Sequence, residues 1–322
     1  MTAAKIIAVA EPLIQPLDAY HSPKVDMLRL DRFDALAPGN KWFKLRENIA
    51  VARKQGARCL VSLGGAYSNH LHALAAWGHH NRWPTAAFIR ADEAQVTPCM
   101  ADLRRWGMRL VHLSRSDYRR RHDPEYIAGL LRGFDRPYFI PEGGANALGA
   151  LGCADIAALL PDCGADYSLI VAACGTGATL AGLASAVAGS TRVLGIPVLK
   201  AEAFMARDIA QILDDLGSPR KNWHLNHRFA GKGFGRVSDE LSEFILRFEA
   251  QQRVPLDPVY TAKLCFAVDA MHKRGELARE SRVLVIHSGG LQGRSGHPAL
   301  FNQSVLGISG QCSGTTKQRS NF

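Results

Sequence analysis

The sequence predicts an α/β protein with two domains, built from mostly parallel, twisted sheets that carry helices on both faces. Apolar, strand-like segments alternate with helix-like segments, which is typical of βαβ units. These apolar segments are nearly continuous, as expected for strands that are covered on both faces. Several of them end in glycines, at the edge where parallel sheets bind ligands.

Length and composition are those of an ordinary globular protein. The chain of 322 residues suits two domains or one large α/β unit. It is 47% hydrophobic and 21% charged, and no apolar segment approaches the roughly 20 residues of a membrane span. The short apolar stretch near the N-terminus is broken by Glu11 and Pro12, so we expect no signal peptide.

The cysteines and the net charge restrict the compartment and the partners. Seven cysteines, an odd number with no CxxC pair, indicate reduced thiols in the cytoplasm and no disulfide framework. The net charge of +10 comes partly from "RSDYRRRHD" (115–123). Such a surface attracts either nucleic acid or small anions. Because no recognised nucleic-acid motif accompanies it, we predict neither a nucleic-acid nor a membrane partner. A non-catalytic nucleotide- or nucleic-acid-binding protein is the alternative from a different class.

Seven strand-like segments are followed by turns or helix-like stretches. They cover residues 57–65, 85–91, 108–114, 136–144, 167–177, 192–199 and 281–290. Four of them end in glycines, at Gly64-Gly65, Gly143-Gly144, Gly175 with Gly177, and Gly289-Gly290. Since ligands bind beyond the carboxyl ends of parallel strands, we expect one site where these glycines meet.

The segment "GNKWFKL" (39–45) brings two lysines together directly after a turn-forming Gly-Asn pair. On a helix that begins here, Lys41 and Lys44 share one face because they are three residues apart. One interpretation is a solvated helix start. The other is a site where one lysine reacts with a carbonyl, as with pyridoxal phosphate (PLP), and its neighbour holds an anion. The reacting amine must be neutral, and we expect the cation of Lys44 and the aromatic rings of Trp42 and Phe43 to lower its pKa.

The segment "CGTGATLAG" (174–182) follows a buried-type strand and opens a helix. Backbone N–H groups left bare by glycine at a helix N-terminus bind anions, and Thr176 and Thr179 add hydroxyl donors. A dinucleotide motif requires a glycine where Leu180 stands, so a single phosphate fits better. A tight strand–helix turn without a ligand is the alternative.

The segment "GGAYSNHLHAL" (64–74) has a similar build, with Ser68 and Asn69 at the start of a helix. These two residues either cap the helix or grip a carboxylate or a ring oxygen. His70 and His72 are two residues apart and face different sides of a helix. We therefore do not interpret them as a metal pair, and we predict no metal site.

Six ordered motifs resemble the 1-aminocyclopropane-1-carboxylate (ACC) deaminase/D-cysteine desulfhydrase family. They are "GNKxxKL", "GGxxSNH", "PEGGANALGALG" (141–152), "CGTGATLAG", "LDPVYTAK" (256–263) and "VIHSGG" (285–290), within residues 10–298. The family consists of fold-type II PLP enzymes, relatives of the tryptophan synthase β subunit. The resemblance therefore implies PLP as the cofactor and a tryptophan synthase β-like fold.

The resemblance also implies roles for matched residues. Lys41 is similar to the lysine that binds PLP covalently, and Lys44 to the neighbour that helps hold the phosphate. Lys41, Tyr260 and Ser68 form the expected catalytic set. The other expected cofactor-binding residues are Asn69, Gly175, Thr176, Gly177, Ala178, Thr179, Thr261 and Ser288. The expected substrate-binding residues are Ser68, Asn69, His70 and Tyr260.

Two positions discriminate within the family. After the tyrosine, ACC deaminases carry Glu, whereas this chain has Thr261, like D-cysteine desulfhydrases. In the H-x-G-G stretch ACC deaminases carry Leu, whereas Ser288 is close to the Thr of the desulfhydrases. Small hydroxyls near a pyridine nitrogen leave it neutral, which suits loss of a thiolate better than opening of a cyclopropane. We therefore expect β-elimination, with ACC deamination or elimination from another amino acid as alternatives.

The chain also departs from both groups of the family. Where they carry a second tyrosine, this chain has Phe234 in "FAGKGFGR" (229–236). The usual "GGxPALxxY" ending is replaced by "GGLQGRSGHP" (289–298), where Gln292 and Arg294 are candidates for the mouth of the site. An arginine there favours an acidic or sulfonated substrate, or it points to solvent. Loss of activity with retention of PLP is a further alternative.

The resemblance implies a large PLP-binding domain formed by residues 1–44 and 146–300, and a small α/β domain formed by 45–145. The polar segment 301–322 is expected to be a mobile tail. The expected assembly is a homodimer. In the expected reaction, Lys41 or Tyr260 removes the α-proton, and D-cysteine yields pyruvate, ammonia and sulfide.

Overall fold

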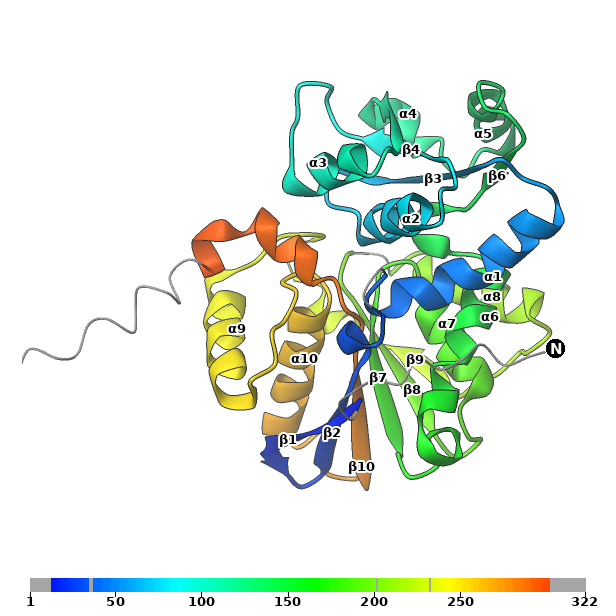
Figure 1. Ribbon diagram of the computed structural model, residues 1–322. Coiled ribbons are helices and arrows are strands. Elements are labelled where there is room, and N and C mark those ends of the chain that lie inside the picture. Colours follow the sequence, from blue (N-terminus) through cyan, green and yellow to red (C-terminus); the bar gives the residue numbers. More distant parts are fainter. Residues whose placement is uncertain (1–12, 35–36, 201, 232, 302–322) are drawn as a thin grey trace, which may run out of the picture.

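A computed structural model describes residues 13–34, 37–200, 202–231 and 233–301 of the chain (Figure 1). Within them the backbone forms a six-stranded and a four-stranded sheet. The predicted tail lies outside the described residues, apart from Phe301. In these ranges no helix has both the length and the apolar character that crossing a membrane requires.

The larger sheet has the strand order β1-β2-β10-β7-β8-β9. Its strands are β1 (Ile14–His21), β2 (Lys24–Arg29), β7 (Leu169–Cys174), β8 (Arg192–Pro197), β9 (Trp223–Leu225) and β10 (Arg282–His287). All neighbouring pairs are parallel except β1 and β2. Val285 of β10 is paired with Met27 on one side and with Val171 on the other. The prediction of mostly parallel sheets is confirmed.

The smaller sheet has the order β5-β4-β3-β6, and all its pairs are parallel. Its strands are β3 (Cys59–Gly65), β4 (Thr85–Arg90), β5 (Arg109–Leu113) and β6 (Pro137–Phe139). Val61 of β3 lies between Ala86 and Phe139. Because the strands are parallel, their carboxyl ends all lie at one edge of this sheet.

The connections between the strands are mainly helical. The α-helices are α1 (Asn40–Lys54), α2 (Asn69–His80), α3 (Pro98–Arg105), α4 (Arg115–Arg119), α5 (Pro124–Leu131), α6 (Ala147–Ala154), α7 (Ala178–Ala186), α8 (Met205–Asp215), α9 (Asp239–Gln252) and α10 (Thr261–Lys273). Short 3-10 turns include η1 (Leu30–Arg32), η2 (Glu142–Gly144), η5 (His227–Phe229) and η6 (Leu291–Gly296).

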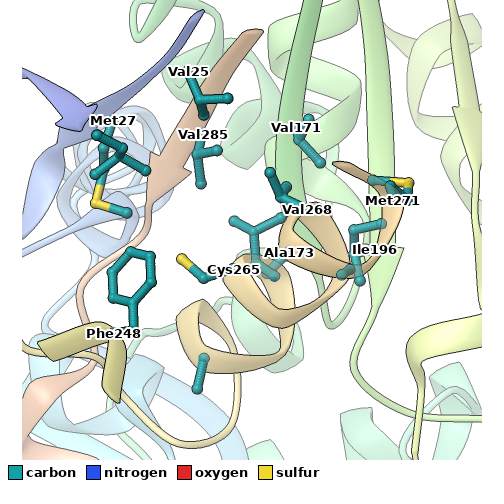
Figure 2. Packing of buried hydrophobic residues seen from close by; sticks show 14 of the residues in the cluster. Val25, Met27, Val171, Ala173, Ile196, Phe248, Cys265, Val268, Met271 and Val285 are labelled. Carbon is teal, nitrogen blue, oxygen red and sulfur yellow. The ribbon is translucent and has the colours of Figure 1, made fainter. Parts of the chain in front are cut away.

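Helices cover both faces of the larger sheet, as predicted. On one face, strand residues such as Val285 and Ile196 pack against Phe248 of α9 and Val268 of α10 (Figure 2). The other face packs on α1, α6, α7 and α8. Full burial of each large apolar side chain contributes about 1.5–3 kcal/mol to the free energy of unfolding. The nearly continuous apolar character of these strands reflects this double burial.

Strand β3 divides its side chains between the two faces of the smaller sheet. Leu60 packs with residues of α1, α2 and α3, whereas Val61 and Leu63 pack on the side of α4 and α5. Since successive side chains of a strand alternate, Ser62 points to the same face as Leu60. A hydroxyl is thereby buried beside α2.

Helix α1 belongs to both hydrophobic cores. Phe43 packs in the core of the larger sheet, whereas Leu45 and Ile49 pack in the core of the smaller sheet. About two turns of α1 therefore anchor its two faces on different sheets, and the helix runs between them (Figure 1). The residues at its start are held relative to both sheets.

All seven predicted strands are present, and three further strands were missed. The missed strands are β1, β2 and β9. β1 lies at a sheet edge, contains Pro16 and has mostly exposed or half-buried side chains. β9 has only three residues at the opposite edge. Edge strands are buried on fewer sides and lack the continuous apolar pattern of the central strands.

The strands of the smaller sheet all lie between residues 59 and 139, and those of the larger sheet lie outside this range. The domain boundaries at 44/45 and 145/146 stay a prediction, because α1 packs on both sheets.

Glycines allow α1, α6 and α7 to approach one another closely. A Cβ atom on Gly152 of α6 would lie 1.8 Å from the carbonyl oxygen of Phe43 in α1. A Cβ atom on Gly182 of α7 would lie 2.4 Å from the carbonyl oxygen of Ala150. Backbone atoms cannot yield as a flexible side chain does, so these positions require glycine.

The substitution Gly152→Ala should lower the free energy of unfolding by about 2 kcal/mol or more, because the added methyl group forces α6 away from α1. The urea midpoint measures this change. Gly129→Ala in α5 is the matched control, since nothing lies within 4 Å of its Cβ position. The control should be neutral or stabilise the protein by up to about 1 kcal/mol. Equal effects of both substitutions would contradict this packing.

Candidate active site

The start of α1 is docked on the end of β10. Gly39 has a φ of 84°, and a Cβ atom there would lie 2.0 Å from the carbonyl oxygen of Ser288. That carbonyl accepts a hydrogen bond of 3.1 Å from the backbone N–H of Asn40. Only glycine fits this contact, which places the lysines of α1 at the carboxyl edge of the larger sheet.

Both lysines of "GNKWFKL" lie in the first turns of α1, as predicted. Lys41 donates a hydrogen bond to the side-chain oxygen of Asn40, and its ammonium lies 5.7 Å from the centre of the Tyr260 ring. Lys44 is only 5% exposed. Within the described ranges, no side chain or carbonyl forms a hydrogen bond or ion pair with the Lys44 ammonium.

The expectation that Trp42 and Phe43 shield the lysines is wrong. Phe43 packs against Phe33 with ring centres 4.8 Å apart, inside the core of the larger sheet. Trp42 packs against the core of the smaller sheet. Residues one and two positions along a helix do not face the same way as Lys41, so these rings fill the cores. The aromatic ring near Lys41 is that of Tyr260.

Burial lowers the pKa of Lys41 to about 7, and the positive charge of Lys44 lowers it further in the same direction. Burial also lowers the pKa of Lys44. These are the two causes expected for a reactive lysine, desolvation and a neighbouring cation. The amine of Lys41 is consequently neutral in a large share of molecules near pH 7, and a neutral amine is a nucleophile.

The loop from Gly175 to Thr179 joins β7 to α7. Gly177 caps α7 with a φ of 84°, and the first residue of the helix is Ala178. The hydroxyl oxygen of Thr176 is buried, and no described residue bonds to it. Bare N–H groups at a helix start and a hydroxyl to which no described residue bonds are the kind of donors that an anion requires, and the predicted anion site stays a prediction.

The side chain of Asn40 connects this loop to Lys41. Its amide nitrogen donates to the hydroxyl of Thr179 at 2.8 Å, and its oxygen accepts from Lys41. The loop contacts two other parts of the site. A Cβ atom on Gly175 would lie 3.1 Å from the Tyr260 ring, and one on Gly143 would lie 3.0 Å from Thr176.

The segment from Ser68 to His70 begins α2 at the carboxyl end of β3. The hydroxyl of Ser68 accepts the backbone N–H of Leu71 at 3.2 Å, so the helix-capping interpretation is confirmed. Its hydroxyl hydrogen stays available to a ligand. Asn69 accepts a hydrogen bond of 2.8 Å from Gln292. His70 bonds to Ser62, whereas His72 pairs with Asp102, so the two imidazoles face different sides.

Tyr260 and Thr261 stand at the start of α10, where an unpredicted carboxylate holds them. Asp257 is 1% exposed and accepts the backbone N–H groups of Val259, Tyr260 and Thr261. The hydroxyl of Thr261 also donates to it at 2.7 Å. The bond from the N–H of Val259 to Asp257, two residues before it, is an Asx turn, for which an Asp in a loop is the sequence signal. The expected contact of Thr261 with a cofactor stays a prediction.

The side chain of Arg294, in the segment after Gly290, has other contacts than expected. Its guanidinium pairs with Glu249 and donates to the carbonyl of Leu256 at 3.0 Å. The interpretation of Arg294 as a group for an acidic substrate, or as a group in solvent, is therefore wrong. Gln292 does lie beside a predicted site residue, Asn69.

Two further predicted residues lie around this edge. Ser288 is buried at the end of β10, where its carbonyl holds Asn40. Phe234 is half exposed, and its ring meets that of Tyr260 edge-on at 5.9 Å. Burial and the charges of Asp257 and Glu142 raise the pKa of Tyr260, so its phenol keeps its proton at neutral pH.

Residues 31–289 match the family model described as "Pyridoxal-phosphate dependent enzyme". The chain is similar to a D-cysteine desulfhydrase of Serratia proteamaculans, with 29% identity over 92% of this chain and 94% of the relative. It is similar to a 1-aminocyclopropane-1-carboxylate deaminase of Burkholderia vietnamiensis, with 30% identity over 89% of this chain and 94% of the relative.

The fold is similar to that in a crystal structure described as an ACC deaminase homologue. The TM-score is 0.77 at 23% identity, and the alignment covers 94% of this chain and 99% of the other. The tryptophan synthase β-like class predicted from the motifs is thereby confirmed at the level of the fold.

Lys41→Met should stabilise the ligand-free protein at pH 6 by at most roughly 3–5 kcal/mol, because it removes an ammonium whose charge is unfavourable in the folded protein. The lowered pKa means that the unfolded chain binds more protons than the native one between about pH 7 and the ordinary lysine value of 10.5. The free energy of unfolding of the wild type therefore rises with pH in this window, and the stabilisation by Lys41→Met becomes smaller. Urea unfolding of both proteins at several pH values measures this difference in unfolding free energy.

Lys54→Met at the exposed end of α1 is the matched control, and it should leave the free energy of unfolding unchanged. A pH-independent gain for Lys41→Met would contradict the low pKa of Lys41.

Proposed function

The chain belongs to the family of pyridoxal-phosphate dependent enzymes, and we propose that it is a lyase that eliminates a β-substituent from a small amino acid. Its preferred substrate in this proposal is D-cysteine, which with water gives pyruvate, ammonia and hydrogen sulfide. The single observation that carries the choice is Thr261, which stands directly after Tyr260 where ACC deaminases carry Glu.

The residues present fit the cofactor. Among the described residues the buried hydroxyl of Thr176 has no partner, and the Lys44 side chain, which is 5% exposed, forms no hydrogen bond or ion pair. In our proposal these two groups and the helix start at Gly177 hold the phosphate. When bound, pyridoxal phosphate supplies an aldehyde that amines join and a ring that accepts electron density from the α-carbon.

Lys41 is the residue proposed to join the cofactor and then to accept the α-proton of the substrate. Its lowered pKa favours the neutral amine that both tasks require. Tyr260 is the candidate proton donor, since its raised pKa keeps the hydroxyl protonated. The ring of Tyr260 lies 5.7 Å from the amine of Lys41, so both groups face one reacting centre. In this proposal Lys41, and not Tyr260, is the base.

Ser68 and Asn69 are proposed to bind the substrate carboxylate. The hydroxyl of Ser68 accepts a backbone N–H and retains its own hydrogen for donation. The side-chain oxygen of Asn69 is occupied by Gln292, so its amide N–H₂ is the end available to a ligand. Donors from two adjacent residues at a helix start suit a carboxylate.

The surroundings of Thr261 support elimination over cyclopropane opening. The carboxylate next to it, Asp257, is already occupied by three backbone N–H groups and the Thr261 hydroxyl. It is therefore not free to keep a pyridine nitrogen protonated. ACC deamination is the second candidate, because a relative with 30% identity carries that name.

The compartment and the assembly of the protein are two further parts of the proposal. A cytoplasmic, reducing compartment fits the six free cysteines of the described residues. We propose a homodimer, because members of the family that the motifs resemble usually assemble as dimers or larger.

The proposal is tested by the visible absorption spectrum of the purified protein before and after addition of D-cysteine, with pyruvate measured in parallel. We expect a cofactor band that shifts, and pyruvate that accumulates. L-cysteine and ACC serve as comparison substrates. A band that responds only to ACC would make the second candidate correct, and no band after addition of pyridoxal phosphate would overturn the site.

Tyr260→Phe should lower kcat by about 10²-fold or more, because it removes one proton-transfer group. The absorption band of bound cofactor should persist, since the ring remains. Tyr126→Phe on α5 is the matched control and should keep full activity. Full activity of Tyr260→Phe would exclude the hydroxyl from the reaction.

A further inference from the structure

The ammonium of Lys263 is buried and joins three segments of backbone. Lys263 lies near the start of α10 and is 3% exposed. Its Nζ donates hydrogen bonds to the carbonyl oxygens of Val198 at 2.9 Å, Ala230 at 3.2 Å and Gly233 at 2.8 Å. One side chain therefore gathers carbonyls from two loops that are about 30 residues apart in the sequence.

The three bonds require the charged form of Lys263. A carbonyl oxygen only accepts, and an ammonium has one N–H group for each of these three carbonyls. A neutral amine has two N–H groups, and its lone pair would face the third carbonyl. Burial lowers the pKa of Lys263, whereas the charge of Asp257 and the bonds to the charged form act in the opposite direction. Because all its donors are used, Lys263 offers none to a ligand.

Two of the three carbonyls, those of Ala230 and Gly233, belong to the segment that carries Phe234. In the part of the chain that the structure describes, nothing lies within 4 Å of a Cβ atom built on Gly233 or on Gly235. Glycines with open space around them give a segment little packing, and such segments open easily. The bonds to Lys263 consequently fix the backbone next to Phe234.

The third carbonyl ties the same segment to the carboxyl edge of the larger sheet. Val198 follows β8, and its N–H donates to the carbonyl of Cys174, the last residue of β7, at 3.0 Å. The next residue is Gly175, where a Cβ atom would lie 3.1 Å from the ring of Tyr260. Lys263 thereby fixes the segment relative to the strands that border the candidate site.

Phe234 is the residue through which this segment reaches the site. Its ring meets that of Tyr260 edge-on, with ring centres 5.9 Å apart. The ring of Tyr260 also lies beside Gly175, and the ammonium of Lys41 lies 5.7 Å from its centre. Loss of the contact with Phe234 would free one side of the phenol ring and allow it more orientations.

We propose that Lys263 is a positioning residue for Tyr260: its ammonium holds the backbone that carries Phe234, and Phe234 holds the phenol ring in the orientation that proton donation requires. The proposal rests on the function proposed above, in which Tyr260 donates a proton. A proton donor must lie within hydrogen-bond distance of its acceptor, and a small misplacement lowers the rate strongly.

The anchoring of the segment is tested by hydrogen exchange of the holoenzyme, measured by mass spectrometry. Lys263→Met keeps the length of the side chain but removes its three donors. Exchange in residues 229–237 should rise at least about tenfold more than exchange in β10, because three bonds to a charged group are lost. Lys273→Met, at the exposed end of α10, is the matched control and should leave both regions unchanged.

Unchanged exchange in residues 229–237 of Lys263→Met would overturn the anchoring. An equal rise in this segment and in β10 would show that Lys263 only stabilises the whole fold, and would overturn the proposal as well.

The effect on Tyr260 is tested with Phe234→Ala, which changes a half-exposed side chain and keeps Lys263. We expect kcat to fall about tenfold with less than a twofold change in KM, because the substrate contacts remain and the phenol is misplaced. In a Tyr260→Phe background there is no hydroxyl to orient. Neither Phe234→Ala nor Lys263→Met should then lower kcat by more than about twofold further.

A wild-type kcat in Phe234→Ala would overturn the positioning role, as would losses that multiply in full in the Tyr260→Phe background. Failure of the proposed function is a distinct outcome, since the wild type itself would then lack the cofactor band or turnover. The exchange measurement does not depend on turnover.

Discussion

The contact between Gly39-Asn40 and Ser288 is the constraint on which the site depends. A carbonyl at the end of β10 occupies the space where any side chain at position 39 would lie. The next residue, Asn40, bonds that carbonyl through its backbone and bridges Lys41 and Thr179 through its amide. Because α1 also packs on both sheets, Lys41 is fixed relative to every element that carries a functional group.

The site concentrates polar groups that the rest of the fold would not tolerate. Lys44, Thr176 and His70 each bury a polar group for which the described residues offer no partner. Burial without a partner costs free energy, and most buried polar groups in proteins are bonded. In the proposed function, the phosphate of the cofactor supplies partners for the first two groups. The apolar cores on both faces of each sheet offset this local cost.

Sequence reasoning identified what depends on local pattern. Glycines at strand ends and the buried strand before "CGTGATLAG" indicate the parallel sheet that the structure has, whereas the anion site at this segment stays a prediction. These features are local because backbone conformation and helix periodicity act over a few residues. The same motifs carried the resemblance that the family match bears out.

What sequence reasoning missed depends on contacts between distant residues. Arg294 is neutralised by Glu249, 45 positions away, and Ser62 reaches Ile140 across 78 positions. Trp42 and Phe43 turned out to belong to two different cores, which follows from the placement of α1 and not from its composition. Such pairings need the fold, because any of several charged or apolar residues fits the local pattern equally well.

The central claim is that one lysine, Lys41, holds the cofactor. Borohydride reduction of the purified enzyme, followed by proteolysis and mass spectrometry, locates the residue to which the cofactor is joined. The account predicts a single modified peptide with the added group on Lys41. Modification of Lys44 in its place, or no modified peptide from an enzyme that carries the cofactor, would contradict it.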